Sequence, residues 1–376
     1  MLKKIKVGVI GVGNCFAGLV QGIEYYKRLQ PTRHPPASRA PKKKRIIGLM
    51  HQKIGPYNFD DIEFSSAFDV GRNKVGKSLD RAVFASPNLV NWIKLPRGKT
   101  VVKEAPVLDG IGIFVENKIN PIKNPTPIGK LEKEIEREIQ RTRTEVLVNY
   151  LPVGSQRATE FWANIALKTK CAFINCIPAF IASNKNWAKR FEKERVPIVG
   201  DDVKSQIGAT IVHRVLTRLC KDRGATIDRT YQINVGGNTD FLNMKEQERL
   251  ESKRISKTEA VTSLLSEKIS PENIYIGPSD FIPFLGNKKL AFIRIEGKMF
   301  ADIPFSLELR LDVDDKANSA GIVIDAIRLA KLALDRKIGG PLISASAYLM
   351  KHPPQQFPDE QAREMVEEFI SGKRER

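Results

Sequence analysis

The stretch SKRISKTEA, residues 252–260, holds two lysines beside a pattern that predicts the start of a helix. Ser256 and Glu259 have the S-x-x-E spacing of a capping box, with Ser256 as the N-cap, so Lys257 is expected in the first helical turn. The helix dipole is positive there and favours anions over ammonium groups. Lys253 and Lys257 are therefore either solvated surface lysines, or cations that meet an anion supplied from elsewhere.

A second candidate site lies where a short β-rich run gives way to a helical pattern. Gly11-Val12-Gly13 stands at this bend. Gly11 would make the tight turn, and Gly13 would let a pyrophosphate approach the amide groups at the helix start. Phe16 occupies the place of the usual third glycine, and Gly18 comes two residues late. The motif alone is a weak indication of a dinucleotide site, since a G-x-G after a strand can be only a turn.

An acidic residue strengthens the dinucleotide prediction. Asp69 closes a predicted second strand, residues 61–70, where a carboxylate can accept both ribose hydroxyls and so favours NAD over NADP. It lies 56 residues beyond the second glycine, whereas the usual gap is ~20. A basic, proline-rich excursion, residues 30–45, would account for the excess. Residues 45–49 are an alternative second strand without a following carboxylate, and Arg72 leaves room for the 2′-phosphate of NADP.

The elements that must position these residues alternate between strand and helix along the first two hundred residues. Three of the predicted strands end in turns that combine polar residues with Gly or Pro: NYLPVGS (149–155), NCIPAFIAS (175–183) and GDDVKS (200–205). In an open α/β sheet, ligands gather at the carboxyl ends of the strands. These turns therefore predict one long ligand-binding region.

The pattern changes beyond residue 201. Three runs, RTYQINVGG, AFIRIEG and FSLELRLDVD, alternate apolar and polar residues, so that Leu307, Leu309 and Leu311 fall on one face. Strands with one wet face indicate a sheet that helices cover on one side only.

The predicted fold class is α/β, with a Rossmann-type doubly wound parallel sheet and an inserted α+β domain. The NAD-binding domain is expected over residues 1–200 and 316–376, and the inserted domain over residues 201–315. A final helix is predicted to start at an Asn318 cap and to pack back on the first domain.

The charge of the chain points to an anionic partner. Among 376 residues, 62 are Lys or Arg and 43 are Asp or Glu, a formal net charge of +19. Nucleic acid, an acidic membrane surface or a phosphorylated metabolite would suit this charge, and a hot habitat could contribute to it. We expect no nucleic-acid partner, because no RRM, helix-turn-helix or zinc-finger pattern appears and aromatic residues make up only 7%.

Cysteines, histidines and apolar runs set further expectations. The four cysteines form no CxxC pair and the four histidines are scattered. A reduced cytoplasmic protein without a zinc site is therefore expected. No signal peptide is expected, and the longest apolar run is too short to span a bilayer.

Nine strings, in order along nearly the whole chain, carry a resemblance to a known family: GVGNC, AFDV, NYLPVGS, NCIPAFIAS, GDDVKSQIGAT, NVGGNTDFLNM, SKRISKTEAV, NSAGIVIDAIR and SAYLMKHPP. Together they resemble the myo-inositol-1-phosphate synthase family, in particular its shorter archaeal and bacterial branch. The resemblance implies that the inserted α+β domain is the catalytic and oligomerisation domain of a homotetramer. It also implies bound NAD, D-glucose 6-phosphate as the substrate and a place in inositol and phospholipid biosynthesis. Some prokaryotic members use a divalent metal, but no ligand set in this sequence indicates one.

The implied reaction explains a cluster of lysines. In the family's scheme the C5 hydroxyl is oxidised, C6 loses a proton, the enolate closes on the C1 aldehyde, and the C5 ketone is reduced again, giving 1L-myo-inositol 1-phosphate. Cations aimed at the developing negative charges are commonly the largest catalytic term. A lysine cluster also lowers the pKa of its members, so that one of them can act as a neutral base.

The resemblance carries the family's residues over to positions of this sequence. The implied catalytic residues are Lys253, Lys257, Lys289, Lys351, Asp240 and Asp315. Lys257 and Lys289 would stabilise the C5 oxyanion or accept its proton, whereas Lys253 and Lys351 would hold the C1 oxygen and the phosphate. The two aspartates would orient lysines or share protons. Lys288 is an adjacent alternative to Lys289, and Asn287 stands where an aspartate is expected.

The expected cofactor-binding residues combine the G-x-G turn with the turns at the strand ends. They are Gly11, Val12, Gly13, Asn14, Cys15, Asp69, Tyr150, Pro152, Ser183, Asp202 and Lys204. The last two are expected near the nicotinamide. The main rival hypothesis is an NAD(P)-dependent dehydrogenase of another phosphorylated substrate, which would consume NAD in proportion to its product.

Overall fold

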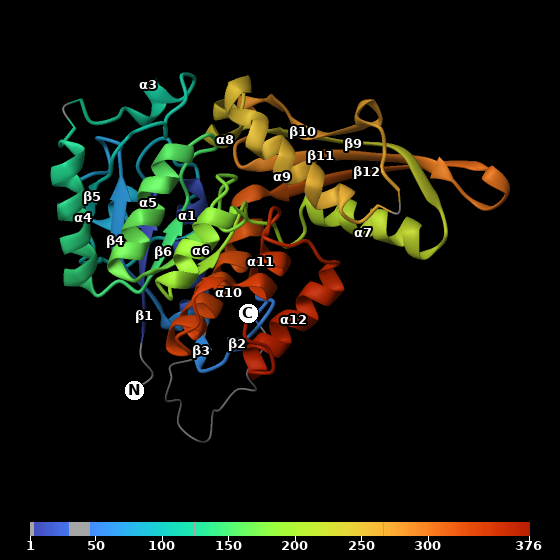
Figure 1. The fold of residues 1–376 in the computed structure, drawn as a ribbon. Helices are drawn as coiled ribbons and strands as arrows, with labels where there is room; N and C mark the ends of the chain where they lie inside the picture. The colour runs from blue at the N-terminus through green and yellow to red at the C-terminus, as the bar shows by residue number, and fades with distance from the viewer. Residues whose placement is uncertain (1–3, 30–45, 124, 266) are drawn as a thin grey trace, which may run out of the picture.

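The structure, a computed structural model, describes residues 4–29, 46–123, 125–265 and 267–376. The basic excursion over residues 30–45 lies outside the described residues. The described chain forms two large sheets that lie side by side and a small two-stranded one, and the chain returns to the first large sheet after completing the second (Figure 1).

The first sheet is parallel and has seven strands among the described residues, in the order β13-β8-β7-β6-β1-β4-β5. Its strands are β1 (Ile5–Ile10), β4 (Ile62–Asp69), β5 (Val102–Glu104), β6 (Val146–Asn149), β7 (Ala172–Asn175), β8 (Pro197–Val199) and β13 (Gly340–Pro341). The predicted doubly wound sheet is confirmed, and so is the choice of β4 as the neighbour of β1.

Helices cover both faces of this sheet, because its strands are apolar on both sides. The helices associated with it are α1 (Asn14–Leu29), α2 (Leu79–Ala82), α3 (Glu116–Ile119), α4 (Ile128–Thr142), α5 (Gln156–Thr169), α6 (Lys185–Lys193), α10 (Asp315–Asp335), α11 (Ile343–Leu349) and α12 (Asp359–Ser371). Val7 and Val9 pack into the core that contains α1 and α10. Leu147 and Phe173 pack into the core that contains α4 and α5.

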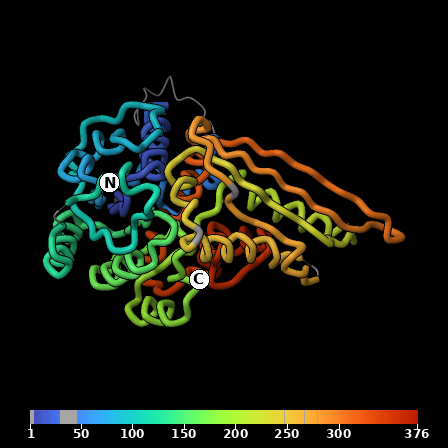
Figure 2. Tube along the Cα trace, turned by 90° about the horizontal axis from the view of Figure 1, so that it is seen from above, coloured from blue at the N-terminus to red at the C-terminus, as the bar shows by residue number. Residues whose placement is uncertain are grey.

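The second sheet is mixed, in the order β10-β9-β11-β12. Its strands are β9 (Thr226–Gly236), β10 (Ile274–Phe281), β11 (Lys288–Lys298) and β12 (Pro304–Asp314), and its helices are α7 (Ala209–Asp222), α8 (Thr239–Asn243) and α9 (Glu251–Thr262). Leu309 and Leu311 pack with Ile293 against α7, as the alternating pattern predicts. Seen from above, the hairpin of β11 and β12 projects away from the first sheet (Figure 2).

Shorter elements complete the described chain. A small hairpin pairs β2 (Lys53–Ile54) with β3 (Tyr57–Asn58). Single 3-10 turns occur at Phe59–Asp61, Gln247–Leu250, Pro271–Asn273, Pro283–Leu285 and Phe300–Asp302.

The long helix α10 ties the two sheets together, but its start differs from the prediction. It begins directly after β12 at Asp315, and Asp314 caps it by accepting hydrogen bonds from the amides of Lys316 and Ala317. Asn318, the predicted cap, lies inside the helix, where its side chain bonds Ile207 across the domain contact. The prediction of an Asn318 cap is therefore wrong, because Asp314 at the strand end caps the helix four residues earlier.

Candidate active site

The turn between β1 and α1 has the backbone geometry that a dinucleotide requires. Gly11 has a φ of +89°, and a Cβ there would lie 2.9 Å from the carbonyl oxygen of Tyr150, so only glycine fits without strain. At Gly13, in contrast, a Cβ would meet nothing within 4 Å. Open space therefore lies over the first turn of α1, whose free amides attract anions.

Asp69 lies beside this turn, at the end of β4. Its Oδ2 accepts a hydrogen bond of 2.8 Å from the amide of Val12, and its Oδ1 accepts one of 2.8 Å from the amide of Gly71. Each carboxylate oxygen has a second lone pair that can still accept a hydroxyl. The buried Lys74 donates to the carbonyl of Val12 at 2.8 Å, a turn contact that the sequence analysis did not anticipate.

The late glycine of the motif has a packing role. A Cβ at Gly18 would lie 3.2 Å from the Trp92 ring and 3.3 Å from the Cβ of Lys316. Gly18 thus allows α1 to approach the start of α10 closely. Phe16, at the position of the missing third glycine, is buried and packs edge-on against Phe64 at 4.8 Å.

The predicted capping box at Ser256 is wrong. The helix α9 begins at Glu251, directly after a 3-10 turn, so Ser256 and Lys257 lie in its middle and Lys253 lies in its first turn. The Ser256 hydroxyl donates instead to Oδ2 of Asp202 at 2.6 Å. A tertiary hydrogen bond, and not a helix cap, is therefore the role of Ser256.

Asp202 joins two of the predicted catalytic lysines. It follows β8 in a left-handed conformation, with a φ of +62°. Its Oδ1 lies 2.7 Å from the ammonium of Lys253 and 3.0 Å from that of Lys351. Burial alone would raise the pKa of this carboxyl, but the two ammonium groups and the Ser256 hydroxyl hold the pKa well below its usual range. Asp202 therefore stays ionised as the counter-ion of both lysines.

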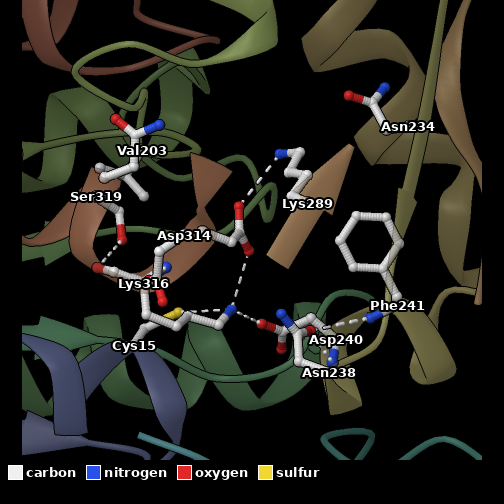
Figure 3. A network of polar contacts seen from close by, with 12 residues as sticks. Cys15, Val203, Asn234, Asn238, Asp240, Phe241, Lys289, Asp314, Lys316 and Ser319 are labelled. Carbon is white, nitrogen blue, oxygen red and sulfur yellow. Dashed lines mark hydrogen bonds and ion pairs between the residues drawn. The ribbon is translucent and has the colours of Figure 1, made fainter. Parts of the chain in front are cut away.

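The third lysine is held by a second group of charges (Figure 3). Lys289 lies 3.3 Å from Oδ1 of Asp315, while the ammonium of Lys316 lies 3.1 Å from Oδ2 of the same carboxylate. Lys316 also lies 2.5 Å from Asp240. Lys288, the alternative to Lys289, is exposed on the other side of β11. The charge balance of Lys289 is thus provided by Asp315, and the amide of Asp315 bonds the carbonyl of Asn287 at 3.0 Å.

Lys257 is the member of the cluster without a counter-ion among the described residues. Its side chain is buried, and no described acceptor bonds its ammonium. Burial, together with the charges of Lys289, Lys253 and Lys351, lowers the pKa of Lys257 well below its ordinary value. The structure therefore brings the four predicted lysines together and makes one of them a candidate neutral amine.

Burial also affects Lys351. It lowers the pKa of this lysine to about 8, although Asp202 opposes the shift. The ammonium of Lys351 donates a hydrogen bond of 2.7 Å to the carbonyl of Val203. Lys351 is therefore charged at neutral pH but close to its titration.

Several predicted cofactor residues line the strand ends next to the turn. The hydroxyl of Tyr150 is buried without a described partner, and burial, Cys176 and Cys15 raise the pKa of Tyr150 well above its usual value. Burial raises the pKa of Cys15 to about 11. The phenol and the two thiols therefore lie close together.

The remaining predicted cofactor residues take part in local bonding. Asn14 accepts from the amide of Leu89 at 2.6 Å, and the carbonyl of Pro152 accepts from Ser155 at 2.6 Å. The Ser183 hydroxyl donates to the buried Asp201 at 2.8 Å.

Lys204 does not join the lysine cluster. Its fully buried ammonium lies 2.9 Å from Asp359 and donates to the carbonyl of Ala347 at 2.7 Å. Burial lowers the pKa of Lys204 to about 8. These contacts tie the turn after β8 to α11 and to the start of α12.

The described residues do not provide a metal site, since they contain no group of three or more His, Cys, Asp or Glu side chains arranged to hold an ion. None of the described helices combines the length and apolarity that a membrane crossing requires.

Comparisons with known proteins agree along almost the whole chain. A family model described as myo-inositol-1-phosphate synthase matches residues 208–316. The inositol-3-phosphate synthase of Mycobacterium tuberculosis is 49% identical over 372 residues, covering 98% of this chain and 96% of the relative. That of Corynebacterium glutamicum is 48% identical over 372 residues, covering 97% and 98%. The solved inositol-3-phosphate synthase of Caenorhabditis elegans has a TM-score of 0.76, covering 98% of this chain and 85% of its own, and at 14% identity it shows the fold alone.

The role of Asp202 as a shared counter-ion can be tested by replacing it. Asp202→Asn leaves two half-buried ammonium groups unpaired, and we expect a loss of about 3–5 kcal/mol of unfolding free energy at pH 7. Because the folded pKa of Asp202 is depressed, its contribution is complete above its unfolded pKa, about 3.9, and should shrink as the pH falls below that value. Urea denaturation measures both effects. Asp222→Asn, which removes an exposed ion pair with Arg218, is the control; equal midpoints for the two variants would contradict the role.

Proposed function

The chain belongs to the inositol-3-phosphate synthase family, and on that premise we propose how its described residues perform the family's reaction. Its enzymatic class is that of inositol-3-phosphate synthase, an isomerase. We propose D-glucose 6-phosphate as the substrate and 1L-myo-inositol 1-phosphate as the product. The observation that carries the proposal is the buried, unpaired Lys257 amine surrounded by the charges of Lys253, Lys289 and Lys351.

The residues around the β1–α1 turn fit NAD, on which the family depends. The amides at the start of α1 and the open space at Gly13 suit the diphosphate. The second lone pairs of the Asp69 carboxylate, whose Oδ2 also lies 3.8 Å from the ammonium of Lys74, suit the ribose hydroxyls. Tyr150, which follows β6, and Cys15, in the first turn of α1, lie close to each other. When bound, NAD supplies the hydride acceptor and later the hydride donor, so the reaction has no net redox change.

In the proposed mechanism the lysines act in two pairs. Lys257, kept neutral by its neighbours, accepts the proton of the C5 hydroxyl, and Lys289 stabilises the oxygen. The ketone at C5 then acidifies C6. A phosphate oxygen of the substrate takes the C6 proton and gives it to the C1 oxygen after ring closure, while the ammonium groups beside the C5 oxygen stabilise the enolate. Lys253 and Lys351, oriented by Asp202, hold the phosphate and the C1 oxygen, where negative charge appears as the enolate attacks the aldehyde.

We assign no step to a divalent metal, because the described side chains offer no ligand set for one. A cytoplasmic location, a role in phospholipid biosynthesis and a hot habitat remain proposals. The four free cysteines and the high lysine content support the first and the last of these.

We also propose that residues 201–315 form the catalytic domain and join copies of the chain into a tetramer. The face of the second sheet opposite α7 carries Phe292, paired with Ile233, and also Tyr231, paired with Tyr275. Phe292 is 38% exposed and Tyr275 is 46% exposed. Apolar side chains that share an open sheet face are typical of an interface between subunits.

The central test is a cyclisation assay of Lys257→Met with catalytic amounts of NAD. We expect turnover to fall by about 10²–10⁴, the usual contribution of a general base, while the affinity for NAD stays unchanged. Lys288→Met, which removes the exposed neighbour on β11, should retain full activity. Wild-type enzyme should form a phosphorylated cyclitol without accumulating NADH. Accumulation of NADH in proportion to product would instead support the dehydrogenase.

The pH dependence of kcat/KM should report the ionisation of Lys351. Because its pKa is about 8, its charge is present at neutral pH and lost as the pH rises, so kcat/KM should fall above about pH 8. Lys351→Arg keeps its charge to much higher pH. We expect the alkaline limb of this variant to move upward, whatever its absolute activity, and that of Lys288→Arg to stay in place. An unmoved limb in Lys351→Arg would assign the titration to another group.

The tetramer can be tested by light scattering after gel filtration. Phe292→Glu places a charge at the centre of the proposed interface and should reduce the assembly to dimers or monomers. Tyr25→Glu changes an equally exposed aromatic residue on α1 and should leave the mass unchanged. A wild-type monomer would exclude the proposed interface.

A further inference from the structure

A fifth lysine, Lys316, lies beside the four lysines of the site, and the proposed mechanism gives its charge no role. The side chain of Lys316, 1% exposed, runs from the start of α10 toward the β1–α1 turn. Its ammonium contacts three groups: Asp240 at 2.5 Å, Asp315 at 3.1 Å and the sulfur of Cys15 at 3.5 Å. Figure 3 shows Lys316 reaching between Cys15 and Asp240, with Lys289 on the far side of the network.

The position of the Lys316 ammonium is set by the way the two domains pack together. Asp315 and Lys316 form the first turn of α10, Asp240 lies on the short helix α8, and Cys15 belongs to α1. Gly18 leaves room for the Lys316 stem, since any Cβ there would lie 3.3 Å from it. Three segments distant in sequence therefore meet at one ammonium group.

The charges show what the ammonium does. Asp315, with a side chain 18% exposed, and the more exposed Asp240 are two carboxylates next to the partly buried thiol of Cys15, and a largely buried carboxylate such as that of Asp315 needs positive charge nearby. If Lys289 alone balanced both carboxylates, less of its charge would be available to a substrate oxygen. With Lys316 bound to both carboxylates, Lys289 contacts only one oxygen of Asp315 and keeps donors free.

The types of these side chains suggest a comparison with a metal site. Two carboxylates and a thiol are groups that bind divalent cations. In this chain, the point that they share holds an ammonium group.

We propose that the Lys316 ammonium is the resident cation of the active site: it occupies the point between Asp240, Asp315 and Cys15, and with the ammonium there the described side chains are not arranged as a ligand group for a divalent ion. The enzyme then requires no divalent metal there, and Lys289 remains available to the substrate. Lys316 is a positioning residue, because it acts through Asp315. The inference about Lys289 rests on the proposed function, whereas the statement about the metal does not.

The first experiment measures metal without substrate. Wild-type enzyme, dialysed against a chelator, is analysed for bound metal and titrated with Co²⁺ while the near-ultraviolet absorption of a thiolate–Co²⁺ complex is followed. We expect no stoichiometric metal and no such band. One tightly bound ion per chain, with a band that Cys15→Ser abolishes, would overturn the proposal. This result does not depend on the roles of the catalytic lysines.

The second experiment removes the ammonium group. We expect Lys316→Ala to lose about 10–100-fold in kcat, as is common when a partner of a site's carboxylates is removed, and to recover part of it with methylammonium in a saturable manner. Lys316→Arg, which keeps the charge, should be less impaired and should not respond to the amine, and it remains informative if the alanine variant does not fold. Full activity of Lys316→Ala, or a loss in both variants that no amine reduces, would refute the role. Lys288→Met, without a response to the amine, is the control.

Discussion

The site depends on the cost of burying like charges next to one another. Four lysine side chains converge in a region where a charged group needs a counter-ion. Asp202 serves Lys253 and Lys351, and Asp315 serves Lys289. Lys257 has no such partner among the described residues, so repulsion and burial act on it together. In the proposed mechanism, the arrangement of two carboxylates thus decides which lysine becomes the base and which remain cations.

The fold brings these charges together from distant parts of the chain. Asp202 follows β8 of the first sheet, Lys289 begins β11 of the second, and Lys351 follows α11 after the chain has returned. Two backbone bonds hold the last contact: the amide of Lys351 donates to the carbonyl of Asp202 at 2.7 Å, and the amide of Asp201 donates to that of His352 at 2.9 Å. The site is therefore complete only when both domains and the C-terminal segment are packed.

Much of the fold and part of the site could be predicted from the sequence, because periodic elements and glycine turns are local signals. The order of strands and helices in the first sheet, the partner strand ending in Asp69 and the convergence of the lysines follow from the pattern or from the family resemblance. The predictions that were wrong or missing concern residues whose places are set by tertiary contacts. Ser256 has a capping spacing, but it bonds Asp202 instead. Strand β10 contains Gly277 and Pro278, residues that weaken a strand pattern. Lys316 could not be told from a surface lysine, since nothing local reveals its two partners.

The same charge balance explains how one site can hold both a base and cations during a reaction that creates and removes negative charge. Before the substrate binds, the repulsion between Lys257 and the neighbouring ammonium groups is relieved only when Lys257 loses its proton. In the proposed mechanism, a sugar phosphate brings a dianion to Lys253 and Lys351, which raises their proton affinity and lowers their repulsion on Lys257. Lys257 then keeps the proton of the C5 hydroxyl and becomes a cation beside the enolate. On our proposal Lys316 takes no part in this exchange, since its ammonium is already paired with Asp240 and Asp315. Because Lys316 stays a cation paired with protein carboxylates, the charges of the other four lysines are available to the substrate.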